Sequence, residues 1–154
     1  MYPGPCEFFI TGFAECLPYH ENKVYLNKDV LDKWGQPTLS IDAEWGANEL
    51  AINAQMRIDA KEMLDRAGLT NVTDFDNKHE MGYGIHEMGT ARMGRDPKTS
   101  VLNGNNQVHD CKNVFVTDGA CMTSSSCVNP SLTYMALTAR AANFAVDELK
   151  KNNL

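Results

Sequence analysis

The sequence lacks an excess of positive charge, long apolar runs and a recognisable targeting segment. Its 154 residues carry 14 basic and 20 acidic side chains, a formal net charge of −6. This argues against general nucleic-acid binding, because phosphates require a basic face. No apolar run approaches the roughly 18 residues of a membrane-spanning helix, and the first residues lack the basic and apolar regions of a signal peptide. The chain alone predicts a cytoplasmic location, and a periplasmic one stays open if an upstream part carries a signal.

Paired cysteine motifs are also missing. The chain has five cysteines, an odd number with no C-x-x-C pair, so we expect free thiols in a reducing compartment. A Cys121–Cys127 disulfide stays open, because sequence does not decide it. We predict no metal site. The remote alternative is a zinc site whose spacing fits no usual pattern, with His109, Cys111, Cys121 and Cys127 as its ligands.

What is present is the composition of a soluble globular chain, 43% apolar and 22% charged, with the length of one ordinary domain. The pattern changes near residue 80. Residues 1–80 indicate a sheet with a covering helix, and residues 81–154 indicate a loop, a strand and a helix in another layer. We therefore expect an α+β fold with two parts.

Strands are predicted mainly in the first third of the chain. Alternation of polar and apolar residues predicts strands at 23–27 and 38–43, and the Phe- and Ile-rich stretch 7–17 predicts another. These three are close enough to form an antiparallel meander. A short strand is expected at 72–75, and an apolar run at 113–117 predicts a strand buried on both faces.

Two helices are predicted from good helix formers and apolar spacing. The first runs from Gly46 to Ala67, with Gly68 as a left-handed terminator. Its expected apolar stripe is Leu50, Ala51, Ala54, Ile58, Met63, Leu64 and Ala67. The second runs from Pro130 to Lys151. Its expected buried face is Leu132, Met135, Ala136, Ala139, Ala142, Val146 and Leu149.

The stretch 82–112 has little periodicity and many turn signals, which is typical of a functional or a disordered segment. His86 lies there between Gly84 and Gly89, where the small residues let a ligand approach the backbone. A neutral imidazole is a general base near pH 7. The alternative is a loop histidine bonded to its surroundings. The H-E-x-x-H zinc motif fails, because position 90 is Thr90.

Two more short motifs follow along the chain. Asn129-Pro130 is a typical helix start, in which Asn129 caps free N–H groups and Pro130 takes the first helical position. The positive end of the helix can instead face an electron-rich ligand. Asp118-Gly119 ends the predicted strand, where a carboxylate can hold a ligand hydroxyl or the pair simply forms a turn.

Together these motifs resemble the C-terminal part of the glucose–methanol–choline (GMC) family of flavin-dependent oxidoreductases. The family pattern is a His before a Gly-Thr-x-x-Met-Gly run, a strand ending in Asp-Gly or Asp-Ala, and an Asn-Pro or His-Pro helix start. The motif-bearing region spans about 84–149, and the overall look is closest to bacterial sugar and gluconate dehydrogenases. In order, the sequence has His86, Gly89-Thr90-Ala91-Arg92-Met93-Gly94, Val116-Thr117-Asp118-Gly119, Asn129-Pro130 and Met135-Ala136-Leu137.

The resemblance implies catalytic roles by position. His86 matches the family's catalytic histidine, which accepts the hydroxyl proton of an alcohol while a hydride leaves for flavin N5. Asn129 matches a second catalytic position, which hydrogen-bonds the substrate oxygen and steadies its developing charge. The substrate class implied is a sugar, polyol or other alcohol.

The resemblance also implies FAD contacts. Asp118 and Gly119 match the stretch that contacts the ribityl and diphosphate region of FAD. The helix start, with Asn129, Pro130 and Ser131, is expected to face the flavin pyrimidine ring, where its dipole favours negative charge. On this view residues 1–80 belong to the substrate domain, and the C-terminal strand and long helix belong to the FAD-binding domain.

One departure is large, because the sequence has no G-x-G-x-x-G dinucleotide-binding motif. We therefore expect a C-terminal fragment that lacks an N-terminal FAD-binding portion, holds FAD weakly and is inactive by itself. Exposed apolar faces should favour homo-oligomers. An electron-accepting partner is expected in place of oxygen. The alternative is a non-catalytic fragment that acts as a partner-binding module.

Overall fold

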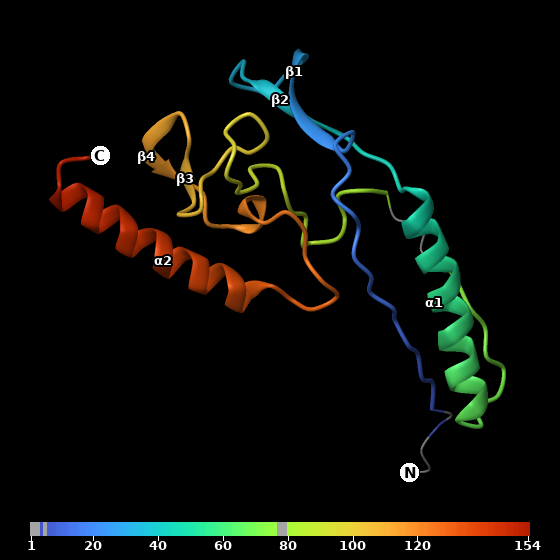
Figure 1. The fold of residues 1–154 in the computed structure, drawn as a ribbon. Coiled ribbons are helices and arrows are strands. Elements are labelled where there is room, and N and C mark those ends of the chain that lie inside the picture. The colour runs from blue at the N-terminus through green and yellow to red at the C-terminus, as the bar shows by residue number, and fades with distance from the viewer. Residues whose placement is uncertain (1–3, 5, 77–79) are drawn as a thin grey trace. The chain divides into compact units, whose positions relative to one another are not determined.

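The computed structural model describes residue 4, residues 6–76 and residues 80–154. In these residues the element order is β1, β2, α1, β3, β4, a 3-10 turn η1 and α2, with two two-stranded antiparallel sheets (Figure 1). The α+β expectation is confirmed at this level. No helix in the described part of the chain is both long and apolar enough to cross a membrane.

The chain divides into two compact units. The first unit holds residues 1–14 and 45–79, and the second holds residues 15–44 and 80–154. Each is described by itself below. The assignment of the strands and the last helix to a substrate domain and an FAD-binding domain stays a prediction, as does the covering of the first sheet by a helix.

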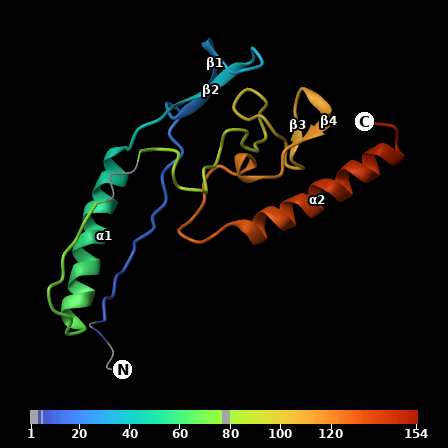
Figure 2. The ribbon, with the colours of Figure 1, turned by 180° about the vertical axis from the view of Figure 1, so that it is seen from behind.

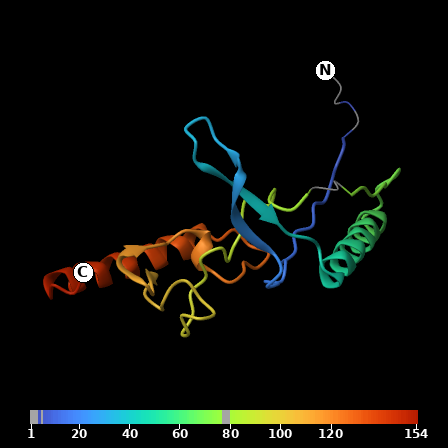
Figure 3. The same cartoon turned by 90° about the horizontal axis from the view of Figure 1, so that it is seen from above.

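The first sheet is a hairpin of β1, Lys23–Leu31, and β2, Pro37–Asp42, and it forms a twisted ribbon (Figure 3). Its turn is closed by Asp32, whose carboxylate accepts the backbone N–H of Trp34 at 2.8 Å and of Gln36 at 2.9 Å. The two predicted strands are confirmed, and β1 is four residues longer than expected.

The predicted three-stranded meander is wrong. Residues 7–17 form no strand and lie in extended, largely exposed backbone. Their Phe and Ile residues have high β propensity, but a strand also needs a neighbouring strand to bond with. Residues 7–14 belong to the compact unit of α1 and not to that of the hairpin, so no ladder forms.

The first helix, α1, spans Ala47–Arg66, as predicted to within a residue at each end. Gly68 follows with φ +82° and donates its N–H to Asp65 O at 3.0 Å, so the left-handed terminator is confirmed. The expected apolar stripe is largely exposed, since Leu50, Ile58 and Met63 are each about 60% exposed.

The segment after α1 runs back beside the helix (Figures 1 and 2). It is attached through Arg57, whose Nε donates to Asp74 Oδ2 at 2.8 Å. The short strand expected at 72–75 is wrong, because this segment meets a helix and finds no strand edge. The Arg57 guanidinium, through its hydrogen bond and charge, lowers the pKa of Asp74.

The second sheet and helix make the C-terminal part. Strands β3, Gln107–Val108, and β4, Cys111–Phe115, pair in antiparallel fashion. The strand predicted at 113–117 therefore begins two residues earlier, and its predicted burial on both faces is wrong. Residues 111–114 are exposed, because β4 has one strand neighbour and packs mainly through Phe115, whose ring meets Phe144 edge-on at 6.3 Å.

The second helix, α2, spans Ser131–Lys150, again as predicted to within a residue, and runs beside the β3–β4 sheet (Figure 2). The predicted buried face is wrong. Leu132 and Met135 are 78% and 69% exposed. The covered residues lie on a neighbouring stripe with the same helical spacing, which explains the error. They are Tyr134, Leu137, Ala141, Phe144, Ala145 and Glu148.

The centre of the second unit is a buried polar hub, Asn106. Its side chain is fully buried beside the equally buried Leu102 and Cys121. Asn106 Nδ2 donates to Val116 O at 3.0 Å, and Arg140 Nη2 donates to Asn106 Oδ1 at 3.0 Å. The hub therefore joins the turn before β3, the end of β4 and α2. It also fixes the strand end from which Asp118 follows.

Candidate active site

The structure brings His86 and Asn129 together, although 43 residues separate them. His86 Nε2 lies 2.8 Å from Asn129 Oδ1. The imidazole is half-buried and Asn129 is exposed, so a ligand can reach the pair from solvent. With the amide oxygen as acceptor, the ring proton sits on Nε2. A half-turn of the amide presents its N–H₂ to an unprotonated Nε2 instead.

A tight turn at residues 84–87 presents His86. Glu87 Oε1 accepts the backbone N–H of Gly84 at 2.6 Å and closes the turn. Ile85, inside it, has φ +67° and an almost fully exposed side chain. A β-branched residue in the left-handed region costs about 1–3 kcal/mol. The Glu87 bond therefore holds strained backbone directly before His86. This role of Glu87 was not predicted from the sequence, where its only signal is the Gly-x-x-Glu spacing.

The chain after His86 is anchored on the 3-10 turn η1, Gly119–Cys121. Ala91 N–H donates to Ala120 O at 3.0 Å, and Met93 N–H donates to Cys121 O at 2.9 Å. Gly89 has φ +88°, and a Cβ there would lie 3.2 Å from Thr123 O. Glycine is therefore required both for the turn and for the close approach.

Asp118 and Gly119 lie at the start of η1. Asp118 Oδ1 accepts the N–H of Ala120 at 3.0 Å, so the carboxylate caps this short turn and leaves its second oxygen available. A Cβ on Gly119 would meet Tyr134 Oη at 2.9 Å and Glu87 O at 3.0 Å. Gly119 is therefore packed between the His86 turn and α2.

The start of α2 differs from the prediction. Pro130 occupies the N-cap position, one residue earlier than expected, and no side chain caps the helix. The expected capping role of Asn129 is wrong, because its side-chain oxygen is turned to His86. Pro130 is buried and Ser131 is exposed. The first N–H groups of α2 have no capping side chain and are available to an electron-rich group.

Tyr134 is a second residue that the sequence analysis missed. Its hydroxyl lies 3.5 Å from Met88 Sδ and contacts the Gly119 position. Burial, then the charges of Asp118, Cys121 and Glu87, raise the pKa of the Tyr134 phenol. The phenol therefore stays protonated through neutral pH. The sequence did not signal this role, because the buried face predicted for this helix did not include Tyr134.

The cysteines form no joint site. None of the five is in a disulfide, so the Cys121–Cys127 bridge is absent. No group of three or more His, Cys, Asp or Glu residues in the described ranges is arranged to hold a metal ion. Of the zinc ligands considered, Cys121 is fully buried and His109 Nε2 bonds Ser100 Oγ at 3.1 Å. The structure gives the zinc alternative no support.

Comparison with known proteins places this geometry in a family. The family model described as GMC oxidoreductase matches residues 18–138. The chain is 36% identical over 132 residues to 2-methyl-1,2-propanediol dehydrogenase of Mycolicibacterium austroafricanum, which is 86% of this chain and 24% of the relative. It is 31% identical over 137 residues to the fructose dehydrogenase large subunit of Gluconobacter japonicus, 89% of this chain and 25% of the relative.

A third relative is the gluconate 2-dehydrogenase flavoprotein of Pantoea cypripedii, 28% identical over 143 residues, with 87% of this chain and 23% of the relative covered. The chain thus spans about a quarter of the length of the curated relatives it matches. The family match covers most of the chain and includes both His86 and Asn129. By this match the chain belongs to the GMC oxidoreductase family.

Proposed function

We propose that this chain is the C-terminal catalytic part of an FAD-dependent oxidoreductase that oxidises an alcohol group of a sugar or polyol. The observation that carries the proposal is the 2.8 Å contact between His86 and Asn129 in a chain matched to the GMC family over residues 18–138. The relatives' printed names, which include a diol dehydrogenase and sugar dehydrogenases, favour this substrate class.

In this proposal His86 is the base. For this the ring proton lies on Nδ1, and the Asn129 amide is turned so that its N–H₂ group faces the unprotonated Nε2. When substrate arrives, Nε2 accepts the hydroxyl proton and the same N–H₂ group donates a hydrogen bond to the substrate oxygen. The turn closed by Glu87 keeps the imidazole oriented, and the buried Pro130 keeps Asn129 in place.

The residues present fit FAD as a cofactor. FAD, when bound, supplies the acceptor for the hydride at flavin N5. The uncapped N–H groups at the start of α2, beginning with Ser131, offer donors and a positive dipole to the electron-rich pyrimidine edge. The free oxygen of the Asp118 carboxylate offers an acceptor for a ribityl hydroxyl, and Gly119 keeps that turn compact.

We further propose that the strand β4 and helix α2 belong to an FAD-binding domain completed by an N-terminal portion. The outer stripe of α2 supports this, because Leu132, Met135, Val146 and Leu149 are exposed and apolar. An electron-accepting partner is suggested by the subunit named in one relative. The competing function is a non-catalytic module that binds a partner. It would bind through the same exposed stripe of α2, and it would not require His86.

The test is a chimera in which this chain replaces the matching C-terminal part of the Mycolicibacterium relative. We expect bound FAD and dye-linked oxidation of an alcohol substrate. His86→Ala should lower kcat by roughly 10²–10⁴-fold while the FAD absorbance stays, and the exposed His20→Ala is the matched control. Unchanged activity in an FAD-loaded His86→Ala chimera would refute the base. An FAD-loaded but inactive parent chimera would favour the binding-module alternative.

The chain alone is expected to hold FAD too weakly to retain it on gel filtration. A yellow, stoichiometric complex after gel filtration would contradict this.

A further inference from the structure

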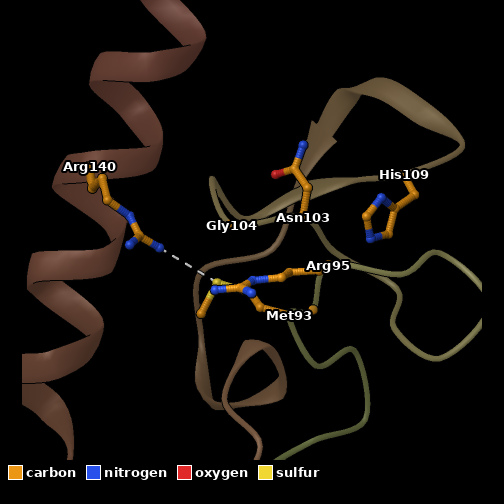
Figure 4. Close-up of a pocket in the computed structure, with 7 residues that line it drawn as sticks. Met93, Arg95, Asn103, Gly104, His109 and Arg140 are labelled. Carbon is orange, nitrogen blue, oxygen red and sulfur yellow. Dashed lines mark hydrogen bonds between the residues drawn. The ribbon is translucent and has the colours of Figure 1, made fainter.

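A cavity of about 510 Å³ opens in the second compact unit, apart from the His86–Asn129 pair. It lies between the segment at 93–95, the turn at 103–104 and α2 (Figure 4). Three of its lining side chains, Arg95, Arg140 and His109, are cationic or can become so, and none is acidic. Such a lining is suited to an anion.

Arg140, on α2, lines one wall of the cavity. Its Nη2 donates to the buried Asn106 Oδ1 at 3.0 Å and lies 3.5 Å from Met93 Sδ. Both acceptors are uncharged. No ion pair is formed by Arg140 with any residue in the described ranges. Arg140 is exposed, but its guanidinium is oriented by this bond to a buried side chain, and among the described residues its charge has no carboxylate partner.

Arg95 adds a second guanidinium to the same cavity. It makes no hydrogen bond or ion pair with the part of the chain that the structure describes. Figure 4 shows that Arg95 and Arg140 line the same cavity from two elements, the segment at 93–95 and α2. Two guanidinium groups at one cavity repel each other. A multiply charged anion between the two guanidinium groups would convert this repulsion into attraction.

The opposite wall offers further donors. Ser100 Oγ donates its hydrogen to Asp96 O at 2.7 Å, so it accepts the His109 Nε2–H at 3.1 Å. This holds the ring, and Nδ1 donates to a ligand in the protonated imidazolium form that an anion favours. Asn103 Nδ2 donates one of its two hydrogens to Gln107 Oε1 at 2.9 Å, so the other remains. At Gly104 nothing lies within 4 Å of the place a Cβ would take, so the mouth is open there.

We propose that this cavity binds a phosphate group, as inorganic phosphate or as a phosphate ester, through Arg95, Arg140 and His109. Planar guanidinium forks match phosphate oxygens in bidentate fashion. Donors on two opposite walls suit a tetrahedral anion with three free oxygens better than a planar carboxylate. The cavity volume, within the usual range for small-molecule sites, leaves room for the organic part of an ester.

The test is a titration of the isotope-labelled chain followed by NMR at constant ionic strength. The probes are inorganic phosphate, glucose 6-phosphate, glucose and acetate. We expect saturable shifts at the amides of Arg95, Gly104 and His109 with at least one of the phosphate compounds, and none with glucose. Binding of both phosphate compounds identifies the phosphate group itself as the ligand. Binding of glucose 6-phosphate alone identifies an ester.

Arg95→Gln is the informative variant, because Arg95 supports no other contact. We expect it to weaken phosphate binding about tenfold, the usual effect of one charge-assisted hydrogen bond. Arg66→Gln, at an exposed position of α1, also removes one positive charge and should leave the phosphate affinity unchanged. The proposal is overturned by the absence of saturable shifts, by equal weakening in both variants, or by acetate binding as tightly as phosphate.

Discussion

The two helices have the same length, 20 residues, and opposite relations to their surroundings. Among its own residues α1 has ion pairs at i,i+4 spacing, Lys61–Asp65 and Arg66–Glu62, and its one buried residue is Glu49. By contrast, α2 buries Ala141, packs Phe144 on β4 and bonds the buried Asn106 through Arg140.

The contrast separates the local helix propensity that forms a helix from the tertiary contacts that attach it to the rest of its unit. Both helices form because their residues favour helix locally. Exposed i,i+4 ion pairs contribute only about 0.3–0.5 kcal/mol each, and the exposed Arg57–Asp74 pair attaches α1 to the segment after it. Buried contacts are worth several times more. Those of α2 reach β4 and Asn106, and Tyr134 reaches Met88, two residues after His86.

The largest expected effect compares two leucines. Leu102 is fully buried in the second unit, and Leu50 on α1 is 60% exposed. We expect Leu102→Ala to lower the free energy of unfolding of its unit by about 2–5 kcal/mol, because it removes buried apolar contacts and leaves a cavity. Leu50→Ala should change stability by at most about 0.5 kcal/mol. Native-state hydrogen exchange measures each unit separately, and equal effects would remove the distinction between the units.

An intermediate effect compares two asparagines with positive φ, Asn106 at +64° and Asn71 at +59°. Glycine tolerates both backbones, so Asn→Gly isolates the side chain. Asn106→Gly should cost about 2 kcal/mol, since it leaves Val116 O and the Arg140 guanidinium without their partner. Asn71 is exposed, and Asn71→Gly should be close to neutral. Urea unfolding followed by circular dichroism tests both, and a neutral Asn106→Gly would contradict the hub.

The same contrast explains which features the sequence could predict. Helix bounds, the β1–β2 hairpin and the Gly68 terminator depend on neighbours in sequence, and all were predicted. The faces of α1 and α2 depend on which elements lie against them. In α2 two apolar stripes share one helical spacing, and only the packing of Phe115 on Phe144 selects between them.

For the candidate site, sequence motifs identified His86 and Asn129 but did not predict the hydrogen bonds that position them. The family pattern identifies both residues, but it does not predict that their side chains are in contact. The predicted cap at Asn129 was wrong because a tertiary hydrogen bond to His86 competes with the local one. Tyr134 was missed for the same reason, since its role depends on distances to Met88 and Gly119 that no local pattern encodes. Glu87 bonds Gly84, three residues before it, and only the common Gly-x-x-Glu spacing signals that bond.

The smallest effect compares two thiols, Cys121 in the buried centre and the exposed Cys6. Burial raises the pKa of the Cys121 thiol. The unfolded chain, whose thiols ionise near pH 8.5, therefore loses this proton at lower pH than the folded chain does. The stabilising contribution is complete below that pH and is lost as the pH rises through the folded-state pKa.

We therefore expect the free energy of unfolding of the second unit to fall as the pH rises above about 8.5, by at most about 1.4 kcal/mol per pH unit. Cys121→Ala should flatten this slope, although it lowers stability at every pH by leaving a small void. Cys6→Ala is the matched control and should leave the slope of the second unit unchanged, because Cys6 is exposed and belongs to the first unit. Parallel slopes in Cys121→Ala and wild type would mean that other groups carry the pH dependence. The buried centre beneath α2 would then be open enough to water for its thiol to ionise as in the unfolded chain.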